Sequence, residues 1–502
     1  MPTIPPLSCP TRDVQRFESL LTSGGDERIA IDAETARNRY GSPRGMAGDE
    51  AWFSSSTATA ISARGYDAAL AAYRLHMEAG HAQSMSAWFG SLRLRLMTLF
   101  GVPGAEIVLS ASGTELELLA LCLARNILPG ALTNVVIAPG ETGRGVMLAA
   151  SGRHFLGSAP LRDKVACGAL LAGFETPETL TAKVEIRDQA GVPLSPDGID
   201  RAAIRSVEDS IALGRSVLIH VLDCSKTNLG GLRRATASLL MTCHAPRVLV
   251  VVDACQLRCS PEQIRADLRA GFMVMISGSK FAAGPPFAGA LLLPPSLVAQ
   301  LGHLDLPPGL LAYTAAEDWP NALQAKVARP FAAAGNAGVG LRWEAALAEL
   351  ERLFALPVRF RDAVSGAFAA AVDKHVLDND ALALVDRDRA GQTQRTIVPI
   401  VTVASETVAL AAEDVYRALR QPRADDGSSA ATSKRIFHVG QPVLIGPRSA
   451  LRVCLSASQI VDVAEPFANG QPFEAAVAPL LADIDGLFLK WARVARDLGR
   501  SA

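Results

Sequence analysis

The sequence has almost no net charge, because its 49 basic and 50 acidic side chains nearly cancel to a formal charge of −1. It therefore lacks the basic surplus through which proteins bind nucleic acid or an anionic membrane surface. We expect small molecules as its partners, with no nucleic acid and no membrane among them.

Targeting and membrane-spanning segments are also missing. The first 17 residues contain no basic stretch followed by an apolar run and a small-residue cleavage site. An uncharged window at residues 281–303 contains four prolines, whereas a membrane helix needs about 20 unbroken apolar residues. The sequence thus predicts a cytoplasmic protein.

The motifs of metal, disulfide and nucleotide chemistry are absent too. The eight cysteines include no Cys-x-x-Cys pair and mostly lie in apolar runs, which predicts buried free thiols and no metal site. There is no P-loop stretch and no strand-anchored Gly-x-Gly-x-x-Gly, so nucleoside triphosphate and dinucleotide sites lose support.

The apolar content of 49% and charged content of 20% predict a packed globular protein. Between about residues 65 and 340, helical periodicity alternates with short β-branched runs, which indicates an α/β fold with a mainly parallel sheet. These runs barely alternate, so helices should cover both faces of the sheet. Strands are predicted at residues 134–138, 216–222, 248–252, 272–276 and 288–293, with crossover helices at 200–213 and 260–270.

The pattern divides the chain into three parts. Residues 1–50 form an irregular N-terminal arm, 51–345 a large domain and 346–502 a smaller α+β domain. The smaller domain should contain helices at 343–356, 408–419 and 473–498, strands at 396–403 and 451–456, and an exposed loop at 424–433.

One acid and one lysine stand at unusual places. Only eight lysines occur beside 41 arginines, and Lys280 follows Ser277-Gly278-Ser279 at the end of an apolar strand. Asp253 ends another apolar strand. Since the carboxyl ends of parallel strands form the ligand crevice of α/β sheets, both side chains should reach one site.

A lysine is needed where a carbonyl must be captured as a Schiff base, since arginine cannot deprotonate. Pyridoxal phosphate (PLP) is the carbonyl cofactor that this predicts, and its pyridine nitrogen needs an anion, which Asp253 is placed to provide. The alternative to a cofactor site is that Asp253 caps a helix and Lys280 is a solvated loop residue. The occurrence of both residues together, in glycine-rich surroundings, favours the cofactor site.

A phosphate site is predicted at residues 110–126, where small residues lead into an amphipathic helix. The amides of Gly113, Thr114 and Glu115 and the Thr114 hydroxyl would hold a phosphate at the helix N-terminus. An ordinary Ser or Thr cap is the alternative. Ser277 and Ser279, beside the lysine, could add hydroxyl donors.

These motifs resemble the fold-type I PLP enzymes, and within them the class V aminotransferase and cysteine desulfurase group, over about residues 52–457. The shared features are Asp253 with Gln256, the Ser-Gly-x-Lys at 277–280, the phosphate turn at 112–115 and the opening segment 54–62. The resemblance implies a large domain with a mainly parallel, seven-stranded-type sheet. It also implies that Gln256 bonds the cofactor's phenolic oxygen, that Ser112 belongs to the phosphate turn, and that a homodimer forms in which residues 331–338 reach the partner's phosphate.

The sequence departs from the family at two positions near the cofactor. Ser279 stands where desulfurases often have histidine. The ring-stacking histidine expected just after residues 134–139 has no clear counterpart, and Thr142 is the nearest candidate. His154 is an alternative, although a lone histidine more often has a structural role than a ligand-binding one.

Arg452 lies where, by resemblance, the family's Arg-x-Ser strand supplies a guanidinium for the substrate carboxylate. Leu451, Val453 and Leu455 take the opposite face of the strand, so Arg452 points away from an apolar layer. In desulfurases a nucleophilic cysteine precedes this arginine on a mobile loop, but residues 437–449 contain none. Cys454 occupies a packing position.

We therefore expect a PLP-dependent enzyme acting on an amino-acid-like substrate, in which Lys280 binds the cofactor and then moves the α-proton. A class V aminotransferase is the main prediction. A C–S lyase or a kynureninase-like C–C lyase is the alternative, and a catalytically silent sensor or assembly subunit is a third. The sequence leaves two alternatives open for Arg39, Tyr40 and Arg44: they could line the substrate pocket, or they could belong to an exposed N-terminal arm.

Overall fold

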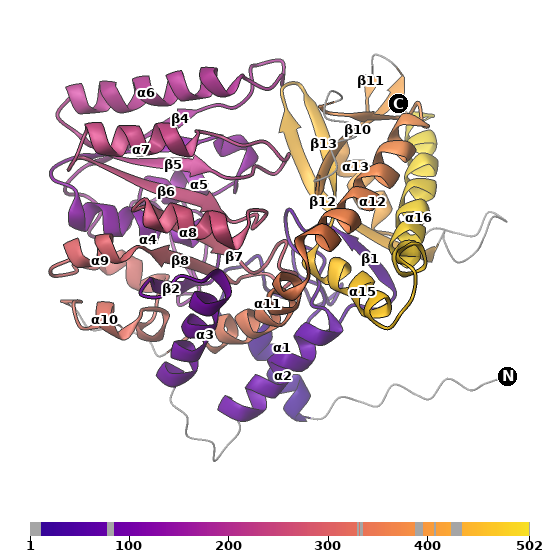
Figure 1. Cartoon of the computed structure of the whole chain (residues 1–502), viewed down its shortest axis with the longest axis horizontal. Coiled ribbons are helices and arrows are strands. Elements are labelled where there is room, and N and C mark those ends of the chain that lie inside the picture. Colours follow the sequence, from indigo (N-terminus) through magenta and orange to yellow (C-terminus); the bar gives the residue numbers. More distant parts are fainter. Residues whose placement is uncertain are drawn as a thin grey trace.

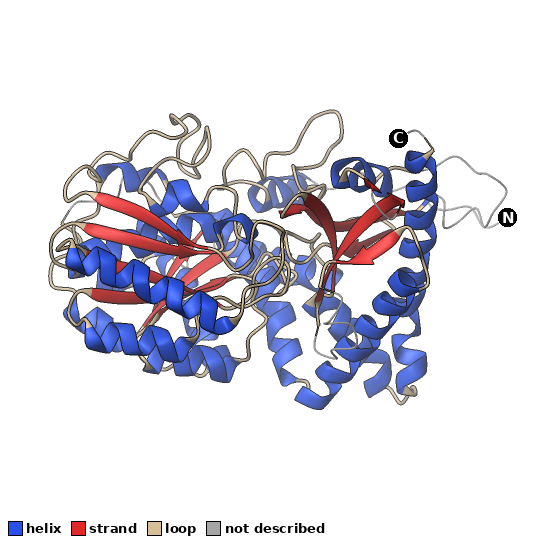
Figure 2. Cartoon of the chain, turned by 90° about the horizontal axis from the view of Figure 1, so that it is seen from above, coloured by secondary structure: helices blue, strands red, loops and turns tan. Residues whose placement is uncertain are grey.

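The chain folds into two α/β units that lie side by side (Figure 1). The computed structural model describes residues 12–77, 85–328, 331, 335–386, 395–405, 408–422 and 434–500. Seen from above, the two sheets are separate and helices pack around both (Figure 2). No helix in the described part of the chain is both long and apolar enough to span a membrane.

The larger sheet has seven strands in the order β2-β8-β7-β6-β5-β3-β4. β8 is antiparallel to both of its neighbours, and the remaining neighbouring pairs are parallel. This confirms the predicted, mainly parallel sheet. The strands are β2 Glu106–Ser110, β3 Leu132–Ile137, β4 Thr179–Val184, β5 Ser216–Leu222, β6 Val248–Ala254, β7 Met273–Ser277 and β8 Gly289–Leu293.

The five predicted strands of this sheet are confirmed, whereas β2 and β4 were not predicted. β4 is an edge strand whose side chains are mostly exposed or half-buried. It therefore lacks the continuous apolar run that marks a strand covered on both faces.

The strands are apolar throughout because their alternate side chains enter two different cores. Val217 and Ile219 of β5 pack in one core with α6, α7 and α8, while Leu218 packs on the other side with α4. The helices of this unit are α3 Met85–Phe100, α4 Gly113–Ile127, α5 Val146–Ala150, α6 Pro196–Ala212, α7 Arg234–Cys243, α8 Pro261–Arg269, α9 Pro295–Gln300 and α10 Asn321–Gln324, with 3₁₀ turns at Pro139–Glu141, Pro308–Ala312 and Ala316–Asp318.

The smaller unit contains a six-stranded sheet in the order β1-β12-β13-β10-β11, with β9 also paired to β10. The strands are β1 Glu50–Phe53, β9 Leu382–Leu384, β10 Ile397–Ser405, β11 Val408–Ala409, β12 Ile436–Ile445 and β13 Arg448–Cys454. The helices beside it are α11 Ala337–Ala355, α12 Val358–Leu377, α13 Ala412–Leu419, α15 Ala457–Ala468 and α16 Phe473–Gly499.

Most predicted elements of this smaller unit are present, with two differences. The helix predicted at 408–419 begins only at Ala412, because residues 408–409 pair with β10 as β11. The segment 437–449, expected as a loop, forms most of the β12–β13 hairpin instead. The predicted loop at 424–433 lies outside the described residues.

The described part of the N-terminal arm is bound to both units. β1 pairs in parallel with β12, so it joins the smaller sheet, although the predicted division begins the large domain at residue 51. Arg342 of α11, which is fully buried, donates to the carbonyls of Leu21 at 3.0 Å, Ser23 at 2.6 Å and Phe287 at 2.6 Å. Together with α1 Arg12–Leu21 and α2 Ala63–Met77, these bonds hold residues 12–49 beside the cavity described next.

Candidate active site

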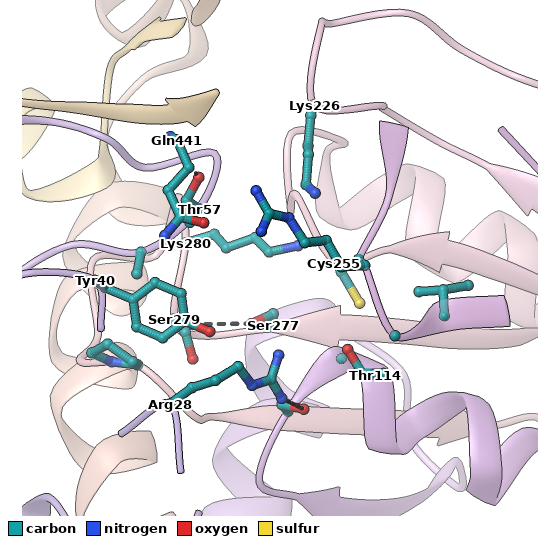
Figure 3. A pocket seen from close by; sticks show the side chains of 18 of the residues that line it. Arg28, Tyr40, Thr57, Thr114, Lys226, Cys255, Ser277, Ser279, Lys280 and Gln441 are labelled. Carbon is teal, nitrogen blue, oxygen red and sulfur yellow. Dashed lines mark hydrogen bonds between the residues drawn. The ribbon is translucent and has the colours of Figure 1, made fainter. Parts of the chain in front are cut away.

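A cavity of about 250 Å³ lies at the carboxyl ends of the parallel strands (Figure 3). Its wall combines side chains from the larger sheet, the smaller sheet and the N-terminal segment. The lining residues include Arg28, Arg39, Tyr40, Thr57, Ser112, Gly113, Thr114, Glu117, Arg144, Lys226, Asp253, Cys255, Ser277, Ser279, Lys280, Gln441 and Arg452.

Asp253 and Lys280 line this one cavity, as their positions at strand ends predict. β6 and β7 are parallel neighbours, with Asp253 opposite Met275, so the turn after β7 reaches the end of β6. One oxygen of Asp253 accepts the N–H of Cys255 at 3.0 Å. The carboxylate is thereby fixed at the cavity wall, near a half-buried lysine.

The predicted phosphate turn also reaches the cavity through Ser112, Gly113 and Thr114. α4 begins at Gly113, and the side chain of Glu115 accepts the backbone N–H of Ser112. Burial, followed by the nearby Asp26, raises the pKa of Glu115 to about 8. Glu115 is therefore mostly neutral near pH 7, so the helix N-terminus carries no full negative charge of its own.

Ser277 and Ser279 lie at the cavity wall but also hold the backbone (Figure 3). The Ser277 hydroxyl donates to the carbonyl of Ala288 at 3.1 Å and accepts the N–H of Ser279 at 3.2 Å. The Ser279 hydroxyl accepts the N–H of Ala288 at 2.6 Å, which leaves its own proton available to a ligand.

Two of the predicted cofactor residues are not among the lining residues. The Thr142 hydroxyl donates to the carbonyl of Pro139 at 3.1 Å, and Arg144 with its flanking glycines reaches the cavity instead. Gln256 donates its amide to the carbonyl of Ser56 at 3.0 Å. His154, the alternative to Thr142, bonds the Tyr313 hydroxyl at 2.7 Å and is likewise absent from the cavity wall.

Arg452 of β13 enters the cavity from the smaller sheet with 1% of its surface exposed. Its Nη2 donates to the Thr57 hydroxyl at 3.0 Å and to the Gln441 carbonyl. Its Nε and Nη1 are buried without a hydrogen-bond partner in the described part of the chain. A Cβ added at Gly440 would lie 2.8 Å from Nε, so the glycine makes room for the guanidinium.

No cysteine of the cavity is activated as a nucleophile. Cys255 lines the wall, but burial and then Asp253 raise the pKa of its thiol well above its usual value. Cys454 is fully buried, donates to the Ser56 hydroxyl at 3.1 Å and does not line the cavity. In the described chain, no group of three or more His, Cys, Asp or Glu side chains is arranged to hold a metal ion.

Sequence reasoning missed Arg28, Lys226 and Glu117. Arg28 forms a two-point ion pair with Asp26, with N–O distances of 2.8 and 2.6 Å, and its Nη2 lies 3.4 Å from the Ser112 hydroxyl. No local pattern marks Arg28, because its place at the cavity depends on how the N-terminal segment packs. Arg39 and Tyr40 do line the cavity, whereas Arg44 does not.

Glu117 is a buried acid that lines the cavity. Burial and the neighbouring Asp253 raise its pKa well above its usual value. Its Oε2 lies 3.5 Å from Nε2 of His220, and burial lowers the pKa of His220 to about 4. Burial therefore disfavours the charged form of both groups.

Three solved structures resemble this chain over nearly their whole length. The cysteine desulfurase CsdA from Escherichia coli aligns at a TM-score of 0.53 with 15% identity, over 89% of this chain and 94% of that one. A mutant of C-DES with glycine covalently linked to its PLP cofactor aligns at 0.53 with 11% identity, over 87% and 96%. The complex of the cystine C–S lyase C-DES with its product cysteine persulfide aligns at 0.51 with 12% identity, over 87% and 97%.

The chain has the fold of these enzymes. This confirms the predicted fold class, a fold-type I architecture with a larger, mainly parallel sheet. No protein-family model matches the sequence, and no curated protein matches it. At 11–15% identity this likeness shows the fold.

Proposed function

We propose that the chain is a PLP-dependent enzyme acting on an amino-acid-like substrate. The observation that carries this proposal is the meeting of Lys280, Asp253 and Arg452 in one cavity at the carboxyl ends of the parallel strands. An amine, an anion and a buried guanidinium with two unused nitrogens are the groups that a carbonyl cofactor and an amino-acid carboxylate require.

The cavity wall fits the cofactor's phosphate as well. The N–H groups of Gly113 and Thr114, in the first turn of α4, make no hydrogen bond within the described residues, as is usual at a helix start. A Cβ on Gly113 would lie 2.9 Å from the Cys255 sulfur, so only glycine lets the turn pass this close. Arg28 adds a positive charge beside Ser112.

When bound, PLP supplies a carbonyl for the substrate amine and a ring that accepts electrons. Three residues of this chain would bind the cofactor, transfer the proton and orient the substrate. Lys280 would hold the cofactor and move a proton at the substrate's α-carbon, and Asp253 would keep the ring nitrogen protonated. Arg452 would orient the substrate through its carboxylate.

The comparisons favour C–S bond cleavage over the transamination that the sequence led us to expect. One neighbour is a cysteine desulfurase and another is a cystine C–S lyase. A desulfurase-type sulfur transfer would need a reactive cysteine, and burial keeps the Cys255 thiol protonated. We therefore infer an eliminating lyase as the reaction, with aminotransfer as the second candidate.

Incubation with amino acids, with and without an added keto acid, tests this reaction. A lyase releases ammonia without a keto acid, whereas an aminotransferase needs one, and Lys280→Ala should abolish either activity. Sulfide release from cysteine that is lost in Cys454→Ala would contradict the inference and assign the enzyme to the desulfurases.

We also propose a homodimer, the assembly implied by the family resemblance. The expected contact segment, residues 331–338, is only partly described, and its Asn336 donates to the carbonyl of Gly24 in the same chain at 2.7 Å. A twofold dimer would contain two equivalent sites. Light scattering should give twice the chain mass; a monomer that keeps full activity on dilution would contradict the dimer.

A further inference from the structure

The cavity wall carries more positive charge than the proposed reaction uses. Six cationic side chains line it, Arg28, Arg39, Arg144, Lys226, Lys280 and Arg452, against the acids Asp253 and Glu117. Asp26 forms an ion pair with Arg28, and burial raises the pKa of Glu117 and so disfavours its charged form. Arg28 lies beside the phosphate turn, and Lys280 and Arg452 already have proposed roles, so Arg39, Arg144 and Lys226 remain at the cavity wall without one.

Lys226 is the most unusual of these cations. It follows β5, and its ammonium points into the cavity (Figure 3). Within the described chain the ammonium makes no hydrogen bond and no ion pair. Burial, and then the charges of Arg452, Lys280 and Arg144, lower its pKa well below the usual value. The Glu141 carboxylate opposes this shift, and an anion bound beside Lys226 would offset the repulsion from these three cations further.

The loop that carries Lys226 is held in place by a buried network. The Lys226 N–H donates to the backbone carbonyl of Glu141 at 3.0 Å. The Glu141 carboxylate accepts from Arg187 at 2.7 Å, from Ser225 at 2.7 Å and from Thr227. Glu141 is therefore already occupied as an acceptor, and its contacts fix the lysine's position without pairing with its charge.

We propose that Lys226, with Arg144 at the cavity mouth, binds a carboxylate on the side chain of the substrate, so that the substrate is an acidic, dicarboxylic amino acid. This inference rests on the proposed function. Arg452 takes the α-carboxylate through its two unused nitrogens. The second carboxylate would lie against Lys226, where its charge would offset the repulsion from Arg452 and Lys280.

Calorimetric titration of the PLP-loaded protein with succinate and with propionate tests the inference. Propionate carries one carboxylate and succinate two, and neither has an amine that could react. Succinate should bind about tenfold more tightly, since a charge-assisted hydrogen bond adds roughly this factor. Lys226→Met should remove the preference and leave propionate binding unchanged.

Lys183→Met is the matched control, because Lys183 lies on the edge strand β4 with an exposed side chain; it should keep the preference. Where Lys226→Met fails to fold, Arg144→Gln, at an exposed position, should reduce the preference.

Three outcomes would overturn the inference: equal affinities in the parent protein, a preference that survives Lys226→Met, or an equal loss of both ligands, which would assign Lys226 to the α-carboxylate. The visible absorption band of the loaded protein is recorded first. Its absence would reject the proposed function and this inference with it, whereas failure of the inference alone leaves the band in place.

Discussion

Arg452 is the residue whose burial is hardest to account for without a bound anion. A fully buried guanidinium normally has all its donors satisfied, because an unpaired buried charge is costly. Here Nη2 is bonded, while Nε and Nη1 remain unused, and burial lowers the pKa of the group. The cost is explained if a carboxylate occupies the cavity beside these two nitrogens.

The Arg452→Lys variant should bind carboxylates about 10–100-fold more weakly, because an ammonium keeps the charge but loses the planar two-point contact. Titration with propionate measures the effect. Cys454→Ala, two residues away on the same strand, is the control and should bind as the parent does. Unchanged affinity in Arg452→Lys would refute the assignment.

Residues at strand ends could be predicted from the sequence, while residues brought in by packing could not. Asp253 and Lys280 follow apolar runs, so the topology of a parallel sheet suffices to bring them together. Thr142 stays a prediction: it is not among the lining residues, whereas Gly143 and Arg144 are, and a sequence pattern does not distinguish adjacent loop residues. Arg28 and Lys226 have no local signal, since their roles depend on segments distant in the sequence.

At the scale of elements, the N-terminus of α4 decides whether a phosphate can bind. The turn passes beside the Cys255 sulfur, and the first two amides of the helix have no partner within the described residues. The sequence predicted this element because small residues precede an amphipathic helix. It did not predict the buried Glu115, whose neutral state depends on Asp26 and on burial.

Gly113→Ala should weaken PLP binding by at least about tenfold while the protein stays folded. The added methyl would stand 2.9 Å from the Cys255 sulfur, so the turn must shift away from the phosphate. Fluorescence titration of the apoprotein with PLP measures the affinity. Gly140→Ala is the matched control, because a Cβ there meets nothing within 4 Å; equal affinities in the two variants would rule out this role for the turn.

The neutral state of Glu115 predicts a pH dependence of stability. Its folded pKa of about 8 lies above its ordinary value of 4.5, so the contribution to stability is complete below about pH 4.5 and is lost as the pH rises to about 8. Relative to Glu115→Gln, the parent should lose on the order of 4 kcal/mol of unfolding free energy across this range. Urea denaturation at several pH values checks this; parallel curves for both proteins would mean that Glu115 is ionised in the folded state.

At the scale of the whole molecule, the cavity exists only because three parts of the chain meet. The larger sheet supplies Asp253 and Lys280, the smaller sheet Arg452, and the N-terminal segment Arg28. Hydrophobic periodicity predicted five strands of the larger sheet and two strands of the smaller one. It left the N-terminal segment as an arm, although Phe17 and Leu21 of this segment pack into a hydrophobic core shared with both sheets and Arg342 donates to the carbonyls of Leu21 and Ser23.

Arg342→Met should destabilise the protein by on the order of 3 kcal/mol, because several buried carbonyls lose a charged donor. PLP affinity should fall as well, since Arg28 is no longer held at the phosphate turn. Arg359→Met, at an exposed position of α12, is the control. Thermal unfolding and PLP titration give the two readouts, and a parent-like result in both would show that the segment is held by other contacts.

The central claim is that Lys280 binds the PLP carbonyl in this cavity. The most direct measurement is borohydride reduction of the PLP-loaded protein, followed by peptide mapping. We expect a yellow protein whose visible band disappears on reduction, with the label on Lys280 and none in Lys280→Ala. A label on Lys226 or on any other lysine, or a Lys280→Ala protein that keeps the parent's band, would contradict it.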